Sequence, residues 1–179
     1  MLELGRINTL KIQAIDGNGA WFAGDQLRIL LPARELPSGA APGDELAVFV
    51  YLNSEGLPLA TLRQPKAQVG EFAYLQVSQI TKYGAFLDWG LDKELLVPFS
   101  EQPERMRAGR KYLVKVCLDD RSRLVATARV ERCLEEPPEL RLGEEVEILL
   151  WEFTDLGVKV IVNDLFPALL YQDEIRPGM

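Results

Sequence analysis

Two aromatic residues near the middle of the chain have the spacing of a base-stacking platform. Tyr83 and Phe86 are three residues apart around Gly84. Because every base presents a flat π-face, stacking on Tyr or Phe contributes ~1–3 kcal/mol per base with little sequence preference. Lysine and arginine beside such a platform bind phosphates, so the pattern predicts a surface for single-stranded nucleic acid. The available cations are Lys82, Arg105, Arg107, Arg110, Lys111, Arg121 and Arg123.

The chain lacks the histidine that many catalytic and metal sites use. It has no histidine, which excludes Ser-His-Asp and Cys-His catalysis, histidine-ligated metals and a histidine pH switch. Its two cysteines, Cys117 and Cys133, form no Cys-x-x-Cys motif. The acidic pairs at 135–136 and 144–145 have no matched metal-ligand spacing. We therefore expect a binding protein and not an enzyme, with no metal site and no cofactor.

Charge is distributed unevenly along the 179 residues, whose formal net charge is -7. Residues 1–65 hold 5 bases and 7 acids, a net charge of -2. Residues 66–134 hold 12 bases and 9 acids, or +3, and residues 135–179 hold 3 bases and 11 acids, or -8. A nucleic acid responds to the local field over a Debye length of ~10 Å. The basic middle segment is therefore the favoured contact surface.

The sequence repeats itself. With a shift of 66 residues, residues 60–63 (ATLR) fall on 126–129 (ATAR), and Glu35 falls on Glu101. A shift of 65 places Gly19 on Gly84, and a weaker third copy at a shift of 73 places Gly84 on Gly157. The third copy ends before any counterpart of residues 107–132. Two full repeats and a truncated third are predicted.

Each repeat carries the alternating pattern of half-buried strands. Residues 46–52, 112–118 and 146–150 alternate with period two, and Gly and Pro turns separate such segments. Only Ser100 to Arg107 offers a short helix. About five strands in ~65 residues favour a small closed barrel without exposed edges. We expect an all-β chain of tandem five-stranded barrels at 1–65 and 66–134, with an incomplete third at 135–179.

The middle repeat resembles the S1 (S-one) domain, an RNA-binding OB-fold barrel named after the first protein of the small ribosomal subunit. The resemblance rests on residues 83–86 (YGAF), 95–101 (LLVPFSE), 109–116 (GRKYLVKV) and 119–123 (DDRSR). It implies that the tandem barrels have the OB fold and that the middle one binds RNA.

The whole chain is similar to the bacterial conserved virulence factor B family. The matching segments are residues 19–22 (GAWF), 30–37 (LLPARELP), 48–51 (VFVY) and 86–91 (FLDWGL). Members are tandem S1-type RNA-binding proteins with three barrels and a C-terminal winged-helix domain. The resemblance implies that this chain is the N-terminal part of such a protein, or a short variant. It also implies a role in bacterial gene expression after transcription, including virulence factor expression.

The resemblance assigns RNA-binding positions unevenly. In the middle repeat the family's two aromatics match Tyr83 and Phe86, its histidine is replaced by Pro98, and its late acid and base match Asp119 or Asp120 with Arg123. The first repeat has Asn18, Trp21 and Ala33 at the aromatic and histidine positions, and the third has Leu156, Lys159 and Tyr171. The RNA-binding residues that we expect are Lys82, Tyr83, Phe86, Arg110, Lys111, Asp119, Arg121 and Arg123.

Structural roles compete with these assignments. Phe86 and Trp21 can face a barrel core instead of solvent, and Trp89 fits the core or packing between repeats. Arg34 and Glu35 fit a surface ion pair, and the cations at 105–111 fit a solvated face.

Two functions therefore stay open. The first is binding of single-stranded RNA with low sequence specificity, favoured by Tyr83, Phe86 and the basic middle repeat. The second is a protein-interaction scaffold of degenerate barrels, favoured by the absence of histidine and by the acidic ends. The first residues contain no apolar run that fits a signal peptide, and no stretch reaches the ~20 apolar residues of a membrane helix. We expect a cytoplasmic protein with no membrane partner and, besides RNA, a protein partner or the family's winged-helix region.

Overall fold

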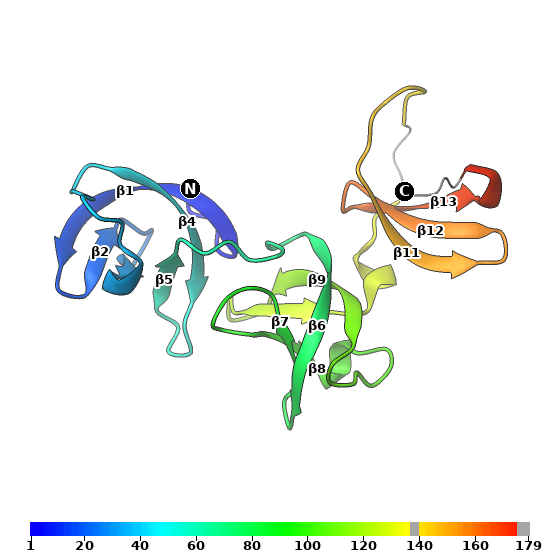
Figure 1. The fold of residues 1–179 in the computed structure, drawn as a ribbon, viewed down its shortest axis with the longest axis horizontal. Helices are drawn as coiled ribbons and strands as arrows, with labels where there is room; N and C mark the ends of the chain where they lie inside the picture. Colours follow the sequence, from blue (N-terminus) through cyan, green and yellow to red (C-terminus); the bar gives the residue numbers. More distant parts are fainter. Residues whose placement is uncertain (137–139, 175–179) are drawn as a thin grey trace. The chain divides into compact units, whose positions relative to one another are not determined.

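The computed structural model describes residues 1–136 and 140–174, and its regular secondary structure is mainly β-strand (Figure 1). The chain forms two compact units, residues 1–128 and 129–179. Between the strands, the described residues form four short 3-10 turns: η1 (Ala33–Glu35), η2 (Phe99–Glu101), η3 (Val130–Cys133) and η4 (Gln172–Glu174).

The first compact unit contains two closed five-stranded barrels. The first barrel has strand order β1-β2-β3-β5-β4, and the second repeats that order as β6-β7-β8-β10-β9. In each, the last strand pairs in parallel with the third, through Leu30 and Leu59 or through Leu96 and Val125. The strands are β1 (Arg6–Asp16), β2 (Gly19–Phe22), β3 (Ile29–Pro32), β4 (Glu45–Leu52), β5 (Pro58–Thr61), β6 (Phe72–Thr81), β7 (Gly84–Asp88), β8 (Leu95–Pro98), β9 (Lys111–Leu118) and β10 (Leu124–Thr127).

Residues 129–179 contain a three-stranded antiparallel sheet, β11 (Ile148–Thr154), β12 (Gly157–Val162) and β13 (Phe166–Tyr171). Its buried cluster is formed by three valines of β12, Val158, Val160 and Val162, with Phe166 of β13. The predicted all-β fold, with two closed barrels and an incomplete third, is confirmed. The domain boundaries at 65–66 and 134–135 stay a prediction.

The three repeats share local features as well as sequence. The first strand of each is interrupted by a β-bulge at the equivalent residue, Gln13, Ser78 or Trp151. The third strand of each runs into an equivalent 3-10 turn, η1, η2 or η4. The described part of the third repeat therefore corresponds to the first three strands and the 3-10 turn of a barrel.

A buried carboxylate–threonine contact joins the 3-10 turn to the last strand of each barrel. Glu35 Oε2 accepts hydrogen bonds from the Thr61 hydroxyl (2.6 Å) and the Leu62 amide (2.8 Å). Glu101 accepts one from the Thr127 hydroxyl at the same distance. Both threonines are almost fully buried. The expected Arg34–Glu35 ion pair is therefore wrong, because Glu35 is occupied inside its own barrel.

The predicted helix at Ser100–Arg107 is also wrong. Only Phe99–Glu101 is helical, as a single 3-10 turn, and Gln102 after it is extended, with φ -106° and ψ 112°. Pro103 has no amide hydrogen to continue a helix and disfavours helical backbone at the residue before it.

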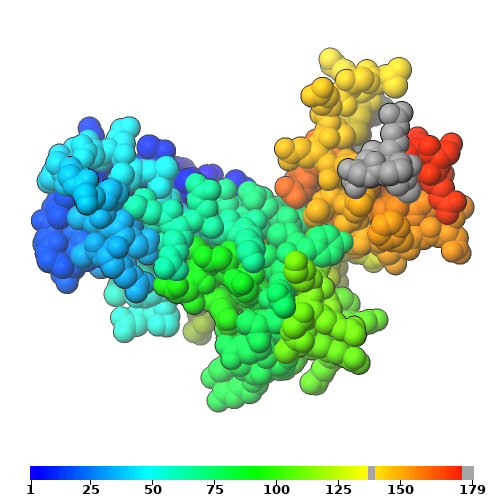
Figure 2. Space-filling model, viewed as in Figure 1, coloured from blue at the N-terminus to red at the C-terminus, as the bar shows by residue number. Residues whose placement is uncertain are grey.

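The two barrels of the first unit are in direct contact (Figure 2). Trp89, in the loop after β7, is 1% exposed and packs edge-on against Phe49 of β4, with ring centroids 5.6 Å apart. Its indole nitrogen donates to the Lys93 carbonyl at 2.6 Å. The backbone amide of Ile7 donates to Gln68 Oε1 at 2.8 Å, which adds a polar contact between the barrels. The sequence left open whether Trp89 lies in a core or packs between repeats, and the structure shows that it packs between them.

Replacing Thr61 by Val should weaken the first barrel. Valine keeps the shape of threonine but leaves Glu35 without its hydroxyl donor, and a hydrogen bond to a charged group contributes about 1.5–3 kcal/mol. We expect the free energy of unfolding, measured in urea, to fall by about 1.5–2 kcal/mol. Thr9→Val, at an exposed strand position, is the matched control. Equal stability of the two variants would contradict a stabilising role for this contact.

Candidate nucleic-acid interface

Phe86 faces outward from the second barrel. On β7 its two neighbours, Ala85 and Leu87, are fully buried in the core, whereas Phe86 is half-buried. Successive side chains of a strand point to opposite faces, so Phe86 lies on the outer surface. In register it stands opposite Leu96 of β8, and Leu96 stands opposite Val125 of β10. We call Phe86, Leu96 and Val125, which share this outer surface, the Phe86 row.

Tyr83 lies in the turn before β7 and is 62% exposed. The Lys82 ammonium lies 5.1 Å from the centre of its ring, a cation–π distance. Tyr83 directly precedes β7 and Phe86 lies at its centre, so an exposed and a half-buried aromatic side chain lie three residues apart, with a cation beside the tyrosine.

Gly84 is required by the sheet and not by a ligand. Its φ is +144°, and a Cβ atom there would collide with the Val97 carbonyl oxygen of β8. Gly19 and Gly157 occupy the same position in the other repeats with the same conformation and an equivalent collision. The glycine of the motif is thus common to all three repeats, whereas a pair of aromatics around it occurs only in the second.

Asp119 organises the turn between β9 and β10. Its Oδ1 accepts hydrogen bonds from the amides of Arg121 and Arg123, both at 2.9 Å, and its Oδ2 pairs with the Arg123 guanidinium at 2.8–2.9 Å. Burial opposes ionisation of Asp119, but these hydrogen bonds and the Arg123 charge outweigh it and hold the pKa of the carboxyl below its ordinary value. Of the two acids that the sequence left open, Asp119 is the partner of Arg123.

Arg110 and Lys111 lie on a different wall of the barrel. Lys111 begins β9 opposite Gln76 of β6, and the Arg110 carbonyl accepts from the Val77 amide. Strand β6 separates them from Phe86 on β7. The structure therefore brings Lys82 to Tyr83 and Arg123 to Asp119, but it does not bring Arg110 and Lys111 into the Phe86 row.

The strand register corrects the residue of the first barrel that the sequence comparison matched to Pro98. Pro98 stands opposite Gly84, and Pro32 stands opposite Gly19. Pro32, and not Ala33, is therefore the counterpart of Pro98 in the first barrel. In the third repeat Tyr171 stands opposite Gly157, as expected.

The first barrel keeps the same framework with different chemistry. Trp21 occupies the position of Phe86 and donates from its indole nitrogen to Asp16 Oδ2 at 2.9 Å. Asn53 replaces Asp119 and accepts from the amides of Glu55 and Leu57, both at 2.9 Å. Leu57 stands where Arg123 does in the second barrel. The first barrel therefore keeps the hydrogen bonds of this turn but has no cation in the place of Arg123.

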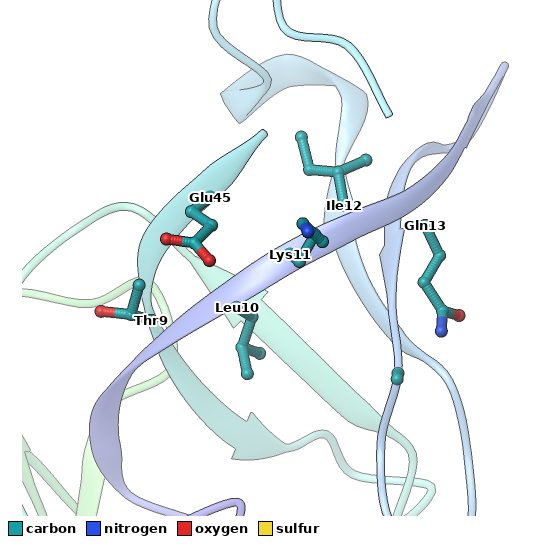
Figure 3. A pocket seen from close by; sticks show the side chains of 7 residues that line it. Thr9, Leu10, Lys11, Ile12, Gln13 and Glu45 are labelled. Carbon is teal, nitrogen blue, oxygen red and sulfur yellow. The ribbon is translucent and has the colours of Figure 1, made fainter. Parts of the chain in front are cut away.

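A surface hollow of about 520 Å³ lies elsewhere on the first barrel, along residues 9–13 of β1 beside Ala23 and Glu45 (Figure 3). Lys11 of β1 and Glu45 of β4 stand opposite each other in register, so the charges lining it are opposed. None of its lining residues is aromatic. It therefore offers neither a stacking surface nor a uniform charge.

Within residues 1–136 and 140–174, no three Cys, Asp or Glu side chains are grouped to hold a metal ion. In the same residues, no helix is long and apolar enough to cross a membrane.

A family model described as "S1 domain" matches residues 4–63 and 69–129, one match on each barrel. This chain belongs to the S1 domain family. S1 domains are nucleic-acid-binding modules, and nucleic-acid binding is therefore the general role that family membership supports.

Curated relatives agree with the resemblance to conserved virulence factor B, which is confirmed. The chain is 29% identical over 141 residues to conserved virulence factor B of Staphylococcus epidermidis (strain ATCC 12228), covering 74% of this chain and 47% of the relative. It is 24% identical over 179 residues to the uncharacterized protein YitL of Bacillus subtilis (strain 168), covering 95% and 60%. The chain thus spans about half of these relatives' lengths.

A crystal structure of a multidomain protein with nucleic acid binding domains, from Streptococcus pneumoniae, has a similar fold. The TM-score is 0.60 at 17% sequence identity, and the match covers 97% of this chain and 64% of the other.

Replacing Asp119 by Ala should destabilise the chain more than replacing it by Asn. Alanine removes the acceptor of two turn amides and should cost about 1 kcal/mol of unfolding free energy. Asparagine keeps that acceptor, as Asn53 does in the first barrel, and loses an ion pair that is partly exposed and contributes well under 1 kcal/mol. Thermal unfolding at neutral pH measures the loss of stability in each of the two variants.

The difference between wild type and Asp119→Asn should depend on pH. The lowered pKa means that the ionised carboxylate stabilises the fold above its ordinary pKa, and that this contribution is lost as pH falls through the lowered value. The two proteins should therefore converge in strong acid. An Asn variant as unstable as the Ala variant at neutral pH would contradict this account.

Proposed function

We propose that this chain binds single-stranded RNA through its second barrel, with little sequence preference. The observation that carries the proposal is the outward, accessible pair Tyr83 and Phe86, with Lys82 over the tyrosine ring. Aromatic faces stack on any base, and cations around them bind the phosphates. The proposed contact residues are Lys82, Tyr83, Phe86, Asp119, Arg121 and Arg123, with Arg110 and Lys111 as flanking cations.

The first barrel supports a lesser role in RNA binding. It has Asn18 in place of Tyr83 and Leu57 in place of Arg123, and its formal charge is negative. We therefore assign the main contact to the second barrel. Because no nucleophile is paired with a base at the site, we propose binding and not catalysis.

The relatives named conserved virulence factor B give the proposal a biological setting. A protein that binds RNA chains with low specificity can alter translation or decay of transcripts in the cytoplasm. We propose that the chain, or a longer protein that contains it, acts on bacterial gene expression in this way, including that of virulence factors.

Replacing both Tyr83 and Phe86 by Ala should abolish most RNA binding. Loss of two stacked bases at ~1 kcal/mol or more each corresponds to ~30-fold or greater weakening. Fluorescence anisotropy of a labelled single-stranded RNA of about a dozen nucleotides, at low and moderate salt, measures it. Phe153→Ala, which removes an exposed phenylalanine of the three-stranded sheet, is the control and should bind as wild type does.

Three comparisons make this test decisive. Circular dichroism must show that the double variant is folded, which is expected because neither side chain is in the barrel core. RNAs of different sequence should bind within a few-fold of one another, and duplex RNA should bind less tightly. No binding by folded wild-type protein at low salt would refute the proposal and favour a protein-interaction scaffold.

A further inference from the structure

The loop after β7 contacts the first barrel and lies near the turn between β9 and β10 of its own barrel. The Lys93 ammonium, in that loop, donates to the Leu52 carbonyl at the end of β4 at 2.9 Å. The same ammonium lies close enough to Arg123 and Asp119 to interact with their charges. Lys93, which the sequence patterns did not single out, therefore joins the first barrel to the Asp119–Arg123 turn.

Cations outnumber the carboxylates that neutralise them at this junction. Asp92, next to Lys93, is shared by two arginines of the first barrel, Arg63 at 2.5 Å and Arg34 at 3.4 Å. Asp119 pairs with the Arg123 guanidinium at 2.8 Å, and its charge also acts on the Lys93 ammonium. A third carboxylate, Glu35 beside Arg34, is engaged by the Thr61 hydroxyl and the Leu62 amide.

Burial makes the charge of Lys93 costly. Burial lowers the pKa of its ammonium, the Arg123 guanidinium lowers it further, and Asp119 only partly opposes them. An additional anion at this place would relieve the repulsion between the two cations.

We propose that the barrel junction is a phosphate subsite for the RNA strand, in which Lys93 and Arg123 bind one backbone phosphate and Arg63 and Arg34 extend the site onto the first barrel. This inference rests on the proposed function of the Phe86 row. It assigns a role in RNA binding to the first barrel, which supplies the arginines and fixes the position of Lys93.

The subsite is within reach of the stacking surface. Arg123 precedes Val125 by two residues, and Val125 lies two strands from Phe86. With strands ~4.8 Å apart and a rise of ~3.3 Å per residue, Arg123 starts ~12 Å from Phe86. An RNA whose bases stack on Tyr83 and Phe86 would therefore pass over β8 and β10 before one of its backbone phosphates reached the barrel junction.

Replacing Lys93 by Gln tests the subsite through the salt dependence of binding. Each phosphate contact to a single strand contributes ~0.7 to the slope of log affinity against log salt. For a twelve-nucleotide RNA, we expect Lys93→Gln to bind about three- to tenfold more weakly at low salt and to flatten the slope by ~0.7. Lys66→Gln is the matched control, because Lys66 has its own carboxylate partner, Asp88 at 3.7 Å.

Replacing Asp92 by Asn distinguishes phosphate binding from a structural role. The variant removes the shared counter-ion of Arg34 and Arg63, so both arginines become available to RNA. We expect roughly two- to fivefold tighter binding at low salt and a steeper slope. A contact that served packing alone would instead lower thermal stability without any gain in affinity.

The outcomes separate this inference from the proposed function. Unchanged affinity and slope in Lys93→Gln, while Tyr83→Ala/Phe86→Ala loses binding, would overturn the subsite and leave the RNA surface in place. Weaker or equal binding by folded Asp92→Asn would also overturn it. If wild type did not bind RNA at low salt, the proposed function itself would fail.

Discussion

The parallel pairing of the third and last strands is the interaction on which the rest of the structure depends. Without it, each of the two barrels would be an open sheet with two unpaired edges. The pairing is brief, with Leu30 opposite Leu59 and Leu96 opposite Val125. In each barrel, a glutamate of the 3-10 turn that follows the third strand accepts a hydrogen bond from the threonine at the end of the last strand. This hydrogen bond stabilises the parallel pairing. Closure then directs Ala85 and Leu87 inward and Phe86 outward.

The repeats divide their residues between architecture and chemistry. The bulge in the first strand, the glycine that starts the second and the 3-10 turn after the third occur in all three repeats. The side chains that could touch a ligand differ at almost every equivalent place, as Tyr83 and Asn18, Arg123 and Leu57, or Phe86 and Lys159 do. Architectural positions are constrained by backbone geometry, which every copy shares. Positions on the outer surface are free to change, so one repeat can carry a binding surface that its neighbours lack.

The sequence was sufficient for the fold because its signals are local or repeated. Period-two alternation, glycine and proline punctuation and the shift of 66 residues together specify two barrels and an incomplete third. It was insufficient where long-range contacts decide. Whether Phe86 faced the core or solvent depended on register with Leu96, and the partner of Arg34 proved to be Asp92, 58 residues away. Lys93 could not be recognised at all, because its surroundings come from β4 and from the turn before β10. The helix expected at Ser100–Arg107 failed for a local reason, the proline at 103.

Phe49 of the first barrel packs against Trp89 of the second, so the two barrels cannot be treated as independent modules. Cutting the chain between them would expose an indole that is now 1% accessible, together with the apolar residues around it. A second barrel isolated in this way would carry a newly exposed hydrophobic patch, and such patches promote association. Its self-association could be mistaken for a property of the natural protein. The two similar barrels of the first unit therefore form one structural piece, and experiments on them should keep them together.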